Sequence, residues 1–181
     1  MKTLSILLLC ATFFLAPQSG SALQINSSET AIADDSDTEA DIKAIRAEYN
    51  RINGLKLKPE TFTYKTQDSV EGGAVSYYTA AAGQIVKVSE QGAMDDAVWR
   101  REYYYKDGQV CFCFETLNWG AAAGPTITTE YRFYIKDGRS IREMSDKKIE
   151  ALNEKSQEAI ARAAKWLEVK GTKAFASVYC L

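Results

Sequence analysis

Two copies of an aromatic-Lys-Asp-Gly pattern constrain the fold of this chain more than any other feature. They are YYYKDGQV at 103–110 and FYIKDGRS at 133–140. Asp-Gly between aromatic and β-branched residues is the strongest short-range signal for a β-hairpin. A weaker third copy, YTAAAGQIVKV from Tyr78, places Gly83, Gly108 and Gly138 at intervals of 25 and 30 residues. The pattern predicts successive hairpins in an antiparallel β-meander of about six strands between residues 55 and 144.

Helical periodicity lies on both sides of this strand-rich region. Ser36 and Glu39 fit a capping box, and a helix over 38–52 is predicted from the apolar residues that recur along one face, Ile42, Ile45, Tyr49 and Ile52. Ser145 is a candidate N-cap for a longer C-terminal helix that ends at Gly171. The order predicts an α+β domain, with both helices packed on one face of the sheet.

The first residues resemble a secretory signal peptide. Lys2 precedes an apolar run, and Gly20 and Ala22 fill the small-residue positions before a cleavage site. We therefore predict a signal peptide at 1–22, an acidic disordered leader at 23–36 and a single domain at 37–181. The mature chain would be secreted or periplasmic, without a transmembrane segment once the signal is removed.

The chain contains no histidine. This excludes Ser-His-Asp and Cys-His catalytic arrangements and histidine-ligated metal sites. No metal site, cofactor or catalytic residue is predicted. Ser145 and Lys148 match S-x-x-K, but a helix N-cap explains that serine better. A carboxylate pair remains available for hydrolysis, and scattered Lys and Arg residues argue against nucleic-acid binding.

Three cysteines remain after signal removal, namely Cys111, Cys113 and Cys180. A disulfide from Cys180 to either of the other two would close a loop of about 70 residues, worth about 4 kcal/mol in the chain-entropy model. The alternatives are unpaired buried thiols or a metal or redox role. A spare cysteine could also bridge a homodimer.

The register of the first Asp-Gly hairpin bears on the cysteines. A two-residue turn would set Tyr103 opposite Phe112 and Tyr104 opposite Cys111, which places both sulfurs on one face. In the hairpin at 130–144, a two-residue loop pairs Arg132 with Glu143. A three-residue loop pairs Phe133 with Ile141, and the sequence does not decide between them.

Consecutive tyrosines in a strand point to opposite faces, so about half of them should face the core. The outward half is the best candidate for a ligand-binding aromatic surface. We assign to it Tyr78, Tyr104 and Tyr134, together with Trp119 in a nearby loop.

The segments YYYKDGQVCFCF and YRFYIKDGRSI resemble those of small exported bacterial proteins of unknown function with repeated aromatic-KDG hairpins. The resemblance covers about residues 70 to 145 and implies an exported domain without an assigned activity. Three hypotheses follow: a non-enzymatic module that binds an extracellular or periplasmic protein or glycan through the outward sheet face, a histidine-free hydrolase with a carboxylate pair, and a structural or assembly component.

Overall fold

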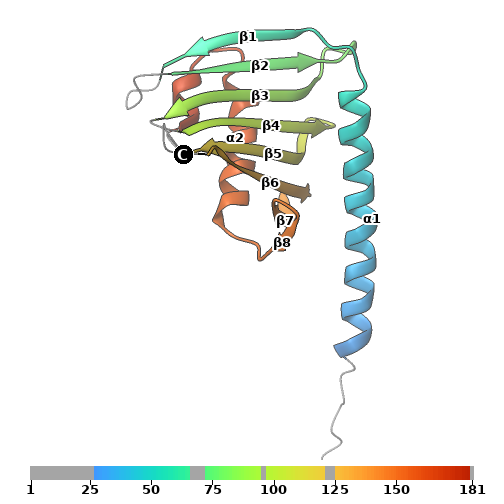
Figure 1. Cartoon of the computed structure of the whole chain (residues 1–181). Helices are drawn as coiled ribbons and strands as arrows, with labels where there is room; N and C mark the ends of the chain where they lie inside the picture. Colours follow the sequence, from blue (N-terminus) through green and yellow to red (C-terminus); the bar gives the residue numbers. More distant parts are fainter. Residues whose placement is uncertain (1–26, 66–71, 95–96, 121–124, 180–181) are drawn as a thin grey trace, which may run out of the picture.

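One antiparallel sheet forms the centre of the molecule, with a long helix at its side and a second helix behind it (Figure 1). The computed structural model describes residues 27–65, 72–94, 97–120 and 125–179, and the side chains of all of these except 27–35 and Met94. In chain order the elements are α1 (Ser27–Asn53), β1 (Pro59–Tyr64), β2 (Gly73–Thr79), β3 (Ile85–Met94), β4 (Ala97–Lys106), β5 (Gln109–Trp119), β6 (Ile127–Lys136), β7 (Arg139–Ser145), β8 (Lys148–Glu150), α2 (Glu154–Val169) and the 3₁₀ helix η1 (Phe175–Tyr179).

The predicted α+β class and antiparallel meander are confirmed. Each strand pairs with the next in the order β1 to β8, so the sheet has eight strands, where the turn pattern predicted about six. The Asp-Gly turns have the expected positive φ, at 51° and 79° for Asp107 and Gly108 and at 50° and 73° for Asp137 and Gly138.

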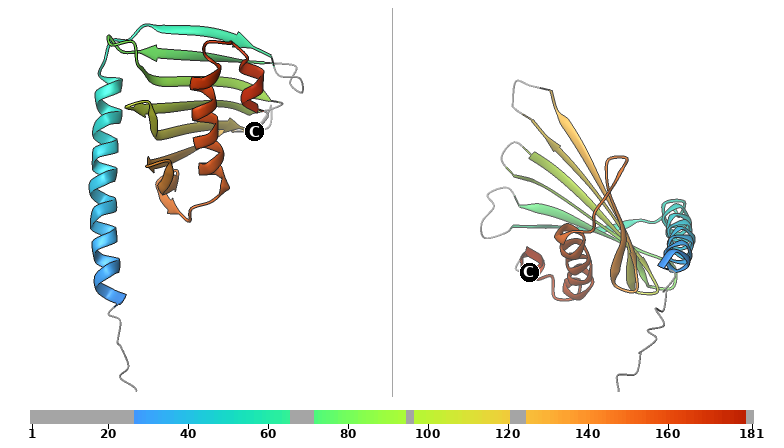
Figure 2. Two further views of the ribbon diagram at one scale, coloured as in Figure 1. Left: turned by 180° about the vertical axis from the view of Figure 1, so that it is seen from behind. Right: turned by 90° about the horizontal axis from the view of Figure 1, so that it is seen from below.

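The two helices lie on opposite faces of the sheet, which corrects the prediction that they share one face (Figure 2). We call the face that packs against α2 and η1 the inner face, and the face that packs against α1 the outer face. The inner core includes Tyr103, Tyr105 and Trp166, whereas Ile42 and Ile45 of α1 pack against outer residues such as Tyr104. Both faces carry buried apolar side chains, so each can hold a helix.

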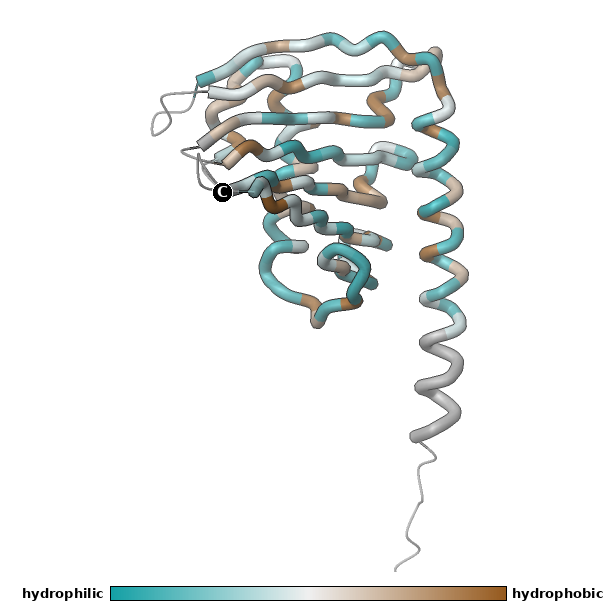
Figure 3. The backbone as a smooth tube through the Cα atoms, in the orientation of Figure 1, coloured by the Kyte–Doolittle hydropathy of each residue, from teal (hydrophilic) through white to brown (hydrophobic). Residues whose placement is uncertain are grey.

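α1 also differs from its prediction in length. It has 27 residues against 16 in α2, and it begins at Ser27, so it takes in most of the expected disordered leader at 23–36. Only its C-terminal half lies beside the sheet, and hydrophobic positions recur at intervals along that half (Figure 3). Ion pairs from Arg142 to Glu39 and from Lys136 to Asp41 flank this contact.

A β-bulge follows each of the three predicted turns at the same distance from the turn glycine. Val86, Cys111 and Ile141 each lie three residues after Gly83, Gly108 and Gly138, and the strand register shifts at each of them. All three residues join the core beneath α1. A bulge adds one residue to one strand, so it changes which residues face each side beyond that point.

These bulges correct the predicted registers. Tyr103 lies opposite Cys113 and Tyr104 opposite Phe112, so Cys111 belongs to the outer core and Cys113 to the inner core. The two sulfurs are therefore not on one face. In the second hairpin Phe133 pairs with Glu143, which neither predicted register contains.

α2 begins later than its predicted N-cap. Ser145 ends β7 and pairs with Lys148 across the turn to β8, so neither residue starts a helix. Asn153 is the N-cap instead, and its Oδ1 accepts a hydrogen bond of 2.8 Å from the Lys155 N–H. β8 occupies part of the segment that was expected to be helical.

Candidate functional site

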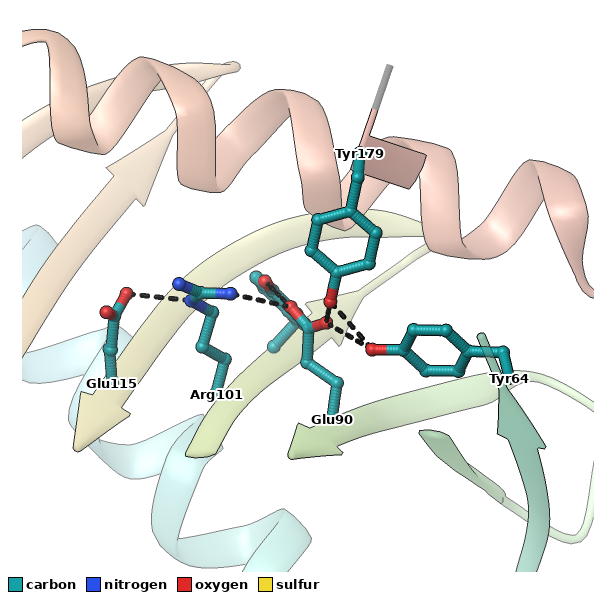
Figure 4. Close-up of polar contacts among 6 residues, drawn as sticks. Tyr64, Glu90, Arg101, Glu115 and Tyr179 are labelled. Atoms are coloured by element: carbon teal, nitrogen blue, oxygen red, sulfur yellow. Dashed lines mark hydrogen bonds and ion pairs between the residues drawn. The ribbon is translucent and has the colours of Figure 1, made fainter. Parts of the chain in front are cut away.

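A row of three charged side chains crosses the central strands on the inner face (Figure 4). Glu90 on β3 pairs with Arg101 on β4, and Arg101 pairs with Glu115 on β5. Arg101 Nε donates to Glu115 Oε2 at 3.0 Å, and Arg101 Nη1 lies 3.8 Å from Glu90 Oε1. Arg101 therefore interacts with both carboxylates.

Glu90 is fully buried, and tyrosine hydroxyls surround its carboxylate. Tyr103 donates to Oε1 at 2.5 Å, and Tyr179 of η1 donates to Oε2 at 2.5 Å. The Tyr64 hydroxyl lies 3.5 Å from Oε2 and 2.7 Å from the Tyr179 hydroxyl. We call Glu90 and its neighbours Tyr64, Arg101, Tyr103, Glu115 and Tyr179 the Glu90 network.

The tyrosines of the Glu90 network act as donors. Burial, together with the nearby charge of Glu90, raises the pKa of Tyr64, Tyr103 and Tyr179 well above the usual value. Their hydroxyls stay protonated across the physiological pH range, so each can donate to the carboxylate. Hydrogen bonds of this kind to a charged group are the stronger class in proteins.

Two glycines allow the aromatic rings of this region to approach the sheet. Tyr64, Gly73, Gly92 and Trp99 form one row across β1 to β4. A Cβ added at Gly73 would lie 2.6 Å from the Tyr64 hydroxyl oxygen, and one at Gly92 would lie 2.5 Å from Trp99 Cζ2. Only glycine leaves room for both rings. Tyr179 then stacks on Tyr64 with 5.9 Å between ring centroids.

The Glu90 network is suited to holding structure together, because its carboxylate has no access to solvent. It links β1, β3, β4 and β5 to η1, so this short helix is anchored to the sheet. A buried carboxylate that lost its donors would be left uncompensated at considerable cost. The network thus fixes the inner face and one end of the sheet.

A second polar cluster joins the outer face to the end of α1. Tyr104 donates to Glu102 Oε2 at 2.6 Å, and Lys87 Nζ lies 3.1 Å from Glu102 Oε1. Both Tyr104 and Lys87 also donate to Asn53 Oδ1, at 3.2 and 3.3 Å. Burial opposes ionisation of Glu102, but these donors and Arg100 outweigh it and lower the pKa of Glu102 below its usual value.

An open cleft of about 650 Å³ lies near the end of the sheet away from the bulges. We call it the outer cleft, because most of its lining side chains belong to the outer face. Its lining consists of Thr63, Tyr64, Lys65, Gly72, Gly73, Ala74, Gln91, Gly92, Ala93 and Val98. The outer cleft and the row of residues from Tyr64 to Trp99 across β1 to β4 therefore share Tyr64, Gly73 and Gly92.

The four aromatic residues predicted to bind a ligand do not form one surface. Tyr104 and Tyr134 are buried beneath α1, at 0% and 4% exposure. Tyr78 is half-buried in the same row of the sheet, with Lys87 Nζ 5.5 Å from its ring centroid. Trp119 is 46% exposed, but it ends β5 on the opposite face. The expected outward patch is thus replaced by the contact with α1.

The cysteines are not a reactive site in the part of the chain that the structure describes. Cys111 and Cys113 are both unpaired and buried. Burial raises the pKa of Cys111 to about 11 and that of Cys113 well above its usual value. Cys180, the third disulfide candidate, lies outside the described residues, as does the predicted signal peptide at 1–22.

The Glu90 network was not predicted from the sequence. The available signal was a charged residue at a core-facing position, since Arg101 shares its face with Tyr103 and Tyr105. Its partners depend on the register of three hairpins.

The described residues contain no group of three His, Cys, Asp or Glu side chains placed to hold a metal ion. No helix among them is both long and apolar enough to cross a membrane.

The chain matches no protein-family model, and comparison with curated proteins and with solved structures found no similar protein.

Proposed function

We propose that this chain is an exported ligand-binding domain whose ligand, a protein or a glycan, occupies the outer cleft. The signal-peptide pattern of the first 22 residues supports export. The outer cleft supports binding, and it is the observation that carries the proposal.

The outer cleft lies on a part of the outer face that is not packed against any helix the structure describes. α2 and η1 pack against the inner face, and α1 packs against the end of the outer face that carries the bulges. The other half of the outer face carries small or polar side chains such as Thr63, Ala74 and Gln91, which are neighbours across β1 to β3. A ligand can reach main-chain groups more easily over small side chains than over large ones.

The cleft has the size and chemistry of a binding site. Its volume of about 650 Å³ falls within the range of small-molecule pockets. Thr63 and Gln91 offer hydrogen-bonding groups, and Val98 is 54% exposed at its rim. Lys65 is the one charged residue among the described residues that line it, which suits a neutral or anionic ligand.

The Glu90 network supports this cleft from the other side of the sheet. Gly73 and Gly92 line the cleft, while Tyr64 and Trp99 lie against those glycines on the inner face. A rigid support of this kind lowers the ordering cost of binding. Apart from Tyr64, which also lines the cleft, the network is therefore assigned a supporting role and not contact with the ligand.

The hydrolase hypothesis has weaker support. Glu90 and Glu115 are the candidate pair of carboxylates, because Arg101 lies 3.8 Å from the first and 3.0 Å from the second. Glu90 is also fully buried, so it cannot reach a substrate without a rearrangement of η1.

The proposal is tested by filling the cleft. The mature protein is screened against a glycan array and against peptidoglycan fragments, and each hit is measured by calorimetry with wild type, Ala74→Trp and Thr128→Trp. Ala74 lines the cleft, whereas Thr128 lies on the same face outside it. We expect Ala74→Trp to weaken binding at least tenfold and Thr128→Trp to leave it unchanged. Equal binding by all three folded proteins would contradict the assignment to the cleft.

Export is tested separately. The protein is expressed in a bacterial host with its own N-terminus, and the mass of the product outside the cytoplasm is determined. We expect a chain that begins at Leu23. A product that keeps Met1 and stays in the cytoplasm would contradict export but not ligand binding.

A further inference from the structure

β1 is one of the two edge strands of the sheet. The main-chain groups along its free edge pair with no other described strand (Figure 1). Its six residues, Pro59–Tyr64, are exposed or half-buried along their whole length. An edge of this kind is a template for one more strand. Pro59 is the one proline in it, and it stands at the first position, where it leaves the rest of the edge able to pair.

A second cleft runs beside this edge on the inner side of the sheet. Its volume is about 600 Å³, and we call it the edge groove. It is lined by Phe62, Thr63, Tyr64, Lys65, Lys173, Ala174, Phe175, Ala176 and Ser177. One wall is therefore β1, and the other is the segment that enters η1. The rings of Phe62 and Phe175 meet in it at a centroid distance of 5.2 Å.

This combination matches the geometry of β-strand addition. An added strand pairs its main chain with the free edge, and alternate side chains point into a neighbouring groove. Phe62 is half-buried and Phe175 is 5% exposed, so the apolar contact that the edge groove offers to one such side chain comes mainly from Phe62, with Phe175 packed behind it. Farther along β1, Glu60 Oε2 lies 3.4 Å from Lys170 Nζ, so this carboxylate already has a charged partner within the chain.

The charge of the edge groove selects among peptides. Lys65 and Lys173 line it, and none of its described lining residues is acidic. The Lys173 ammonium lies 5.2 Å from the centroid of the Phe62 ring, close to the apolar contact. An acidic segment would gain from both lysines, whereas a basic one would be repelled.

We infer that β1 and the edge groove receive an extended acidic peptide as an additional strand of the sheet, with an aromatic or aliphatic side chain against Phe62 and Phe175. The edge groove shares Thr63, Tyr64 and Lys65 with the outer cleft but lies on the inner side of β1, and the inference does not depend on the proposed function. The partner is then an extended segment of a protein with acidic and apolar side chains.

Binding is tested by fluorescence anisotropy with the mature protein and a labelled peptide, ETVTFTDE. Two further versions carry N-methyl groups on alternate residues, one on the odd and one on the even positions. In an added strand only every second N–H points toward the edge. We expect one methylated version to bind at least tenfold more weakly and the other to bind within twofold of the parent.

Protein variants test the charge. Lys65→Glu combined with Lys173→Glu should weaken binding at least fivefold, and the effect should shrink in high salt. Lys148→Glu, at the opposite edge of the sheet, and Thr128→Trp, on the outer face and in neither cleft, should leave peptide binding unchanged. Circular dichroism confirms that each variant is folded.

Three outcomes would overturn the inference. They are no binding of any peptide up to millimolar concentration, equal loss from both methylation patterns, or equal binding of a version with lysine in place of its acidic residues. If the chain forms a dimer that dissociates when the peptide is added, the edge of β1 would be assigned to a second copy of the chain. That result would also overturn the inference. Because the methylation series changes only the peptide, it is unaffected by any folding defect of a variant.

Discussion

Tyr179 donates a hydrogen bond of 2.5 Å to the buried carboxylate of Glu90, although 89 residues separate them in the chain. This contact ties the last described turn of the chain to the third strand of the sheet. It also brings the Tyr179 ring over Tyr64, which belongs to the first strand. The C-terminal segment is therefore part of the sheet's support.

Tyr179→Phe should destabilise the protein. The change removes one donor to a buried charged acceptor and keeps the ring, so the free energy of unfolding should fall by about 1–3 kcal/mol. Urea denaturation followed by tryptophan fluorescence measures it. Tyr131→Phe is the control, because no hydrogen bond from the Tyr131 hydroxyl is found within the described residues. A loss as large in the control would mean that the bond to Glu90 has no special role.

Gly92→Ala should destabilise through a steric clash. The added methyl group would lie 2.5 Å from Trp99 Cζ2, and the ring is held between the sheet and Arg101, whose Cζ lies 4.4 Å from the ring centroid. Overpacking of this kind costs about 1–3 kcal/mol. Gly171→Ala, which meets no atom within 4 Å, should change stability by less than about 0.5 kcal/mol. Thermal unfolding of both variants makes the comparison, and similar melting temperatures would contradict the close packing of Trp99.

Ile42→Ala should release α1 more effectively than the loss of an ion pair at its side. Ile42 has no exposed surface, and removing such a side chain costs about 2–5 kcal/mol. Glu39 pairs with Arg142 but is itself 53% exposed, so Glu39→Gln should have a much smaller effect. Hydrogen exchange along α1 reports the result. Faster exchange in Glu39→Gln than in Ile42→Ala would show that charge, not apolar contact, holds the helix.

Glu102 should contribute to stability above acidic pH and cease to do so in acid. Its pKa is lowered in the folded state, so its contribution is present above the unfolded value of about 4.3 and disappears as the pH falls through the folded pKa. The stability difference between wild type and Glu102→Gln should therefore be largest at neutral pH and shrink below about pH 4. Urea denaturation at several pH values tests this, with Glu150→Gln on the exposed β8 as the matched variant. A constant difference down to pH 2.5 would contradict the lowered pKa.

The elements that were predicted correctly rest on short-range chemistry. Asp107-Gly108 and Asp137-Gly138 form the expected turns because glycine and aspartate accept positive φ. Ile42, Ile45 and Ile52 bury the predicted face of α1, since their spacing follows the helical period. The signal peptide, export and the pairing of Cys180 remain predictions.

The errors in strand register share one cause, the bulges at Val86, Cys111 and Ile141. Each inserts one residue after a turn, so an alternation counted outward from that turn assigns the following residues to the wrong face. For this reason Cys111 and Cys113 were expected together and lie apart. Tyr104 faces outward as predicted, but α1 covers it, because nothing near Tyr104 in the chain shows which face α1 will take.

Local composition and periodicity alone thus account for the meander, the turns and the apolar face of α1, since each depends on contacts within a few residues. The folded chain decides which face each helix covers, which tyrosines reach solvent and which charges meet at Glu90. Those outcomes depend on the register of several strands at once and on contacts such as Tyr179 to Glu90, which span half the chain. No short window of residues contains that information, because its physical basis is the packing of distant segments against one another.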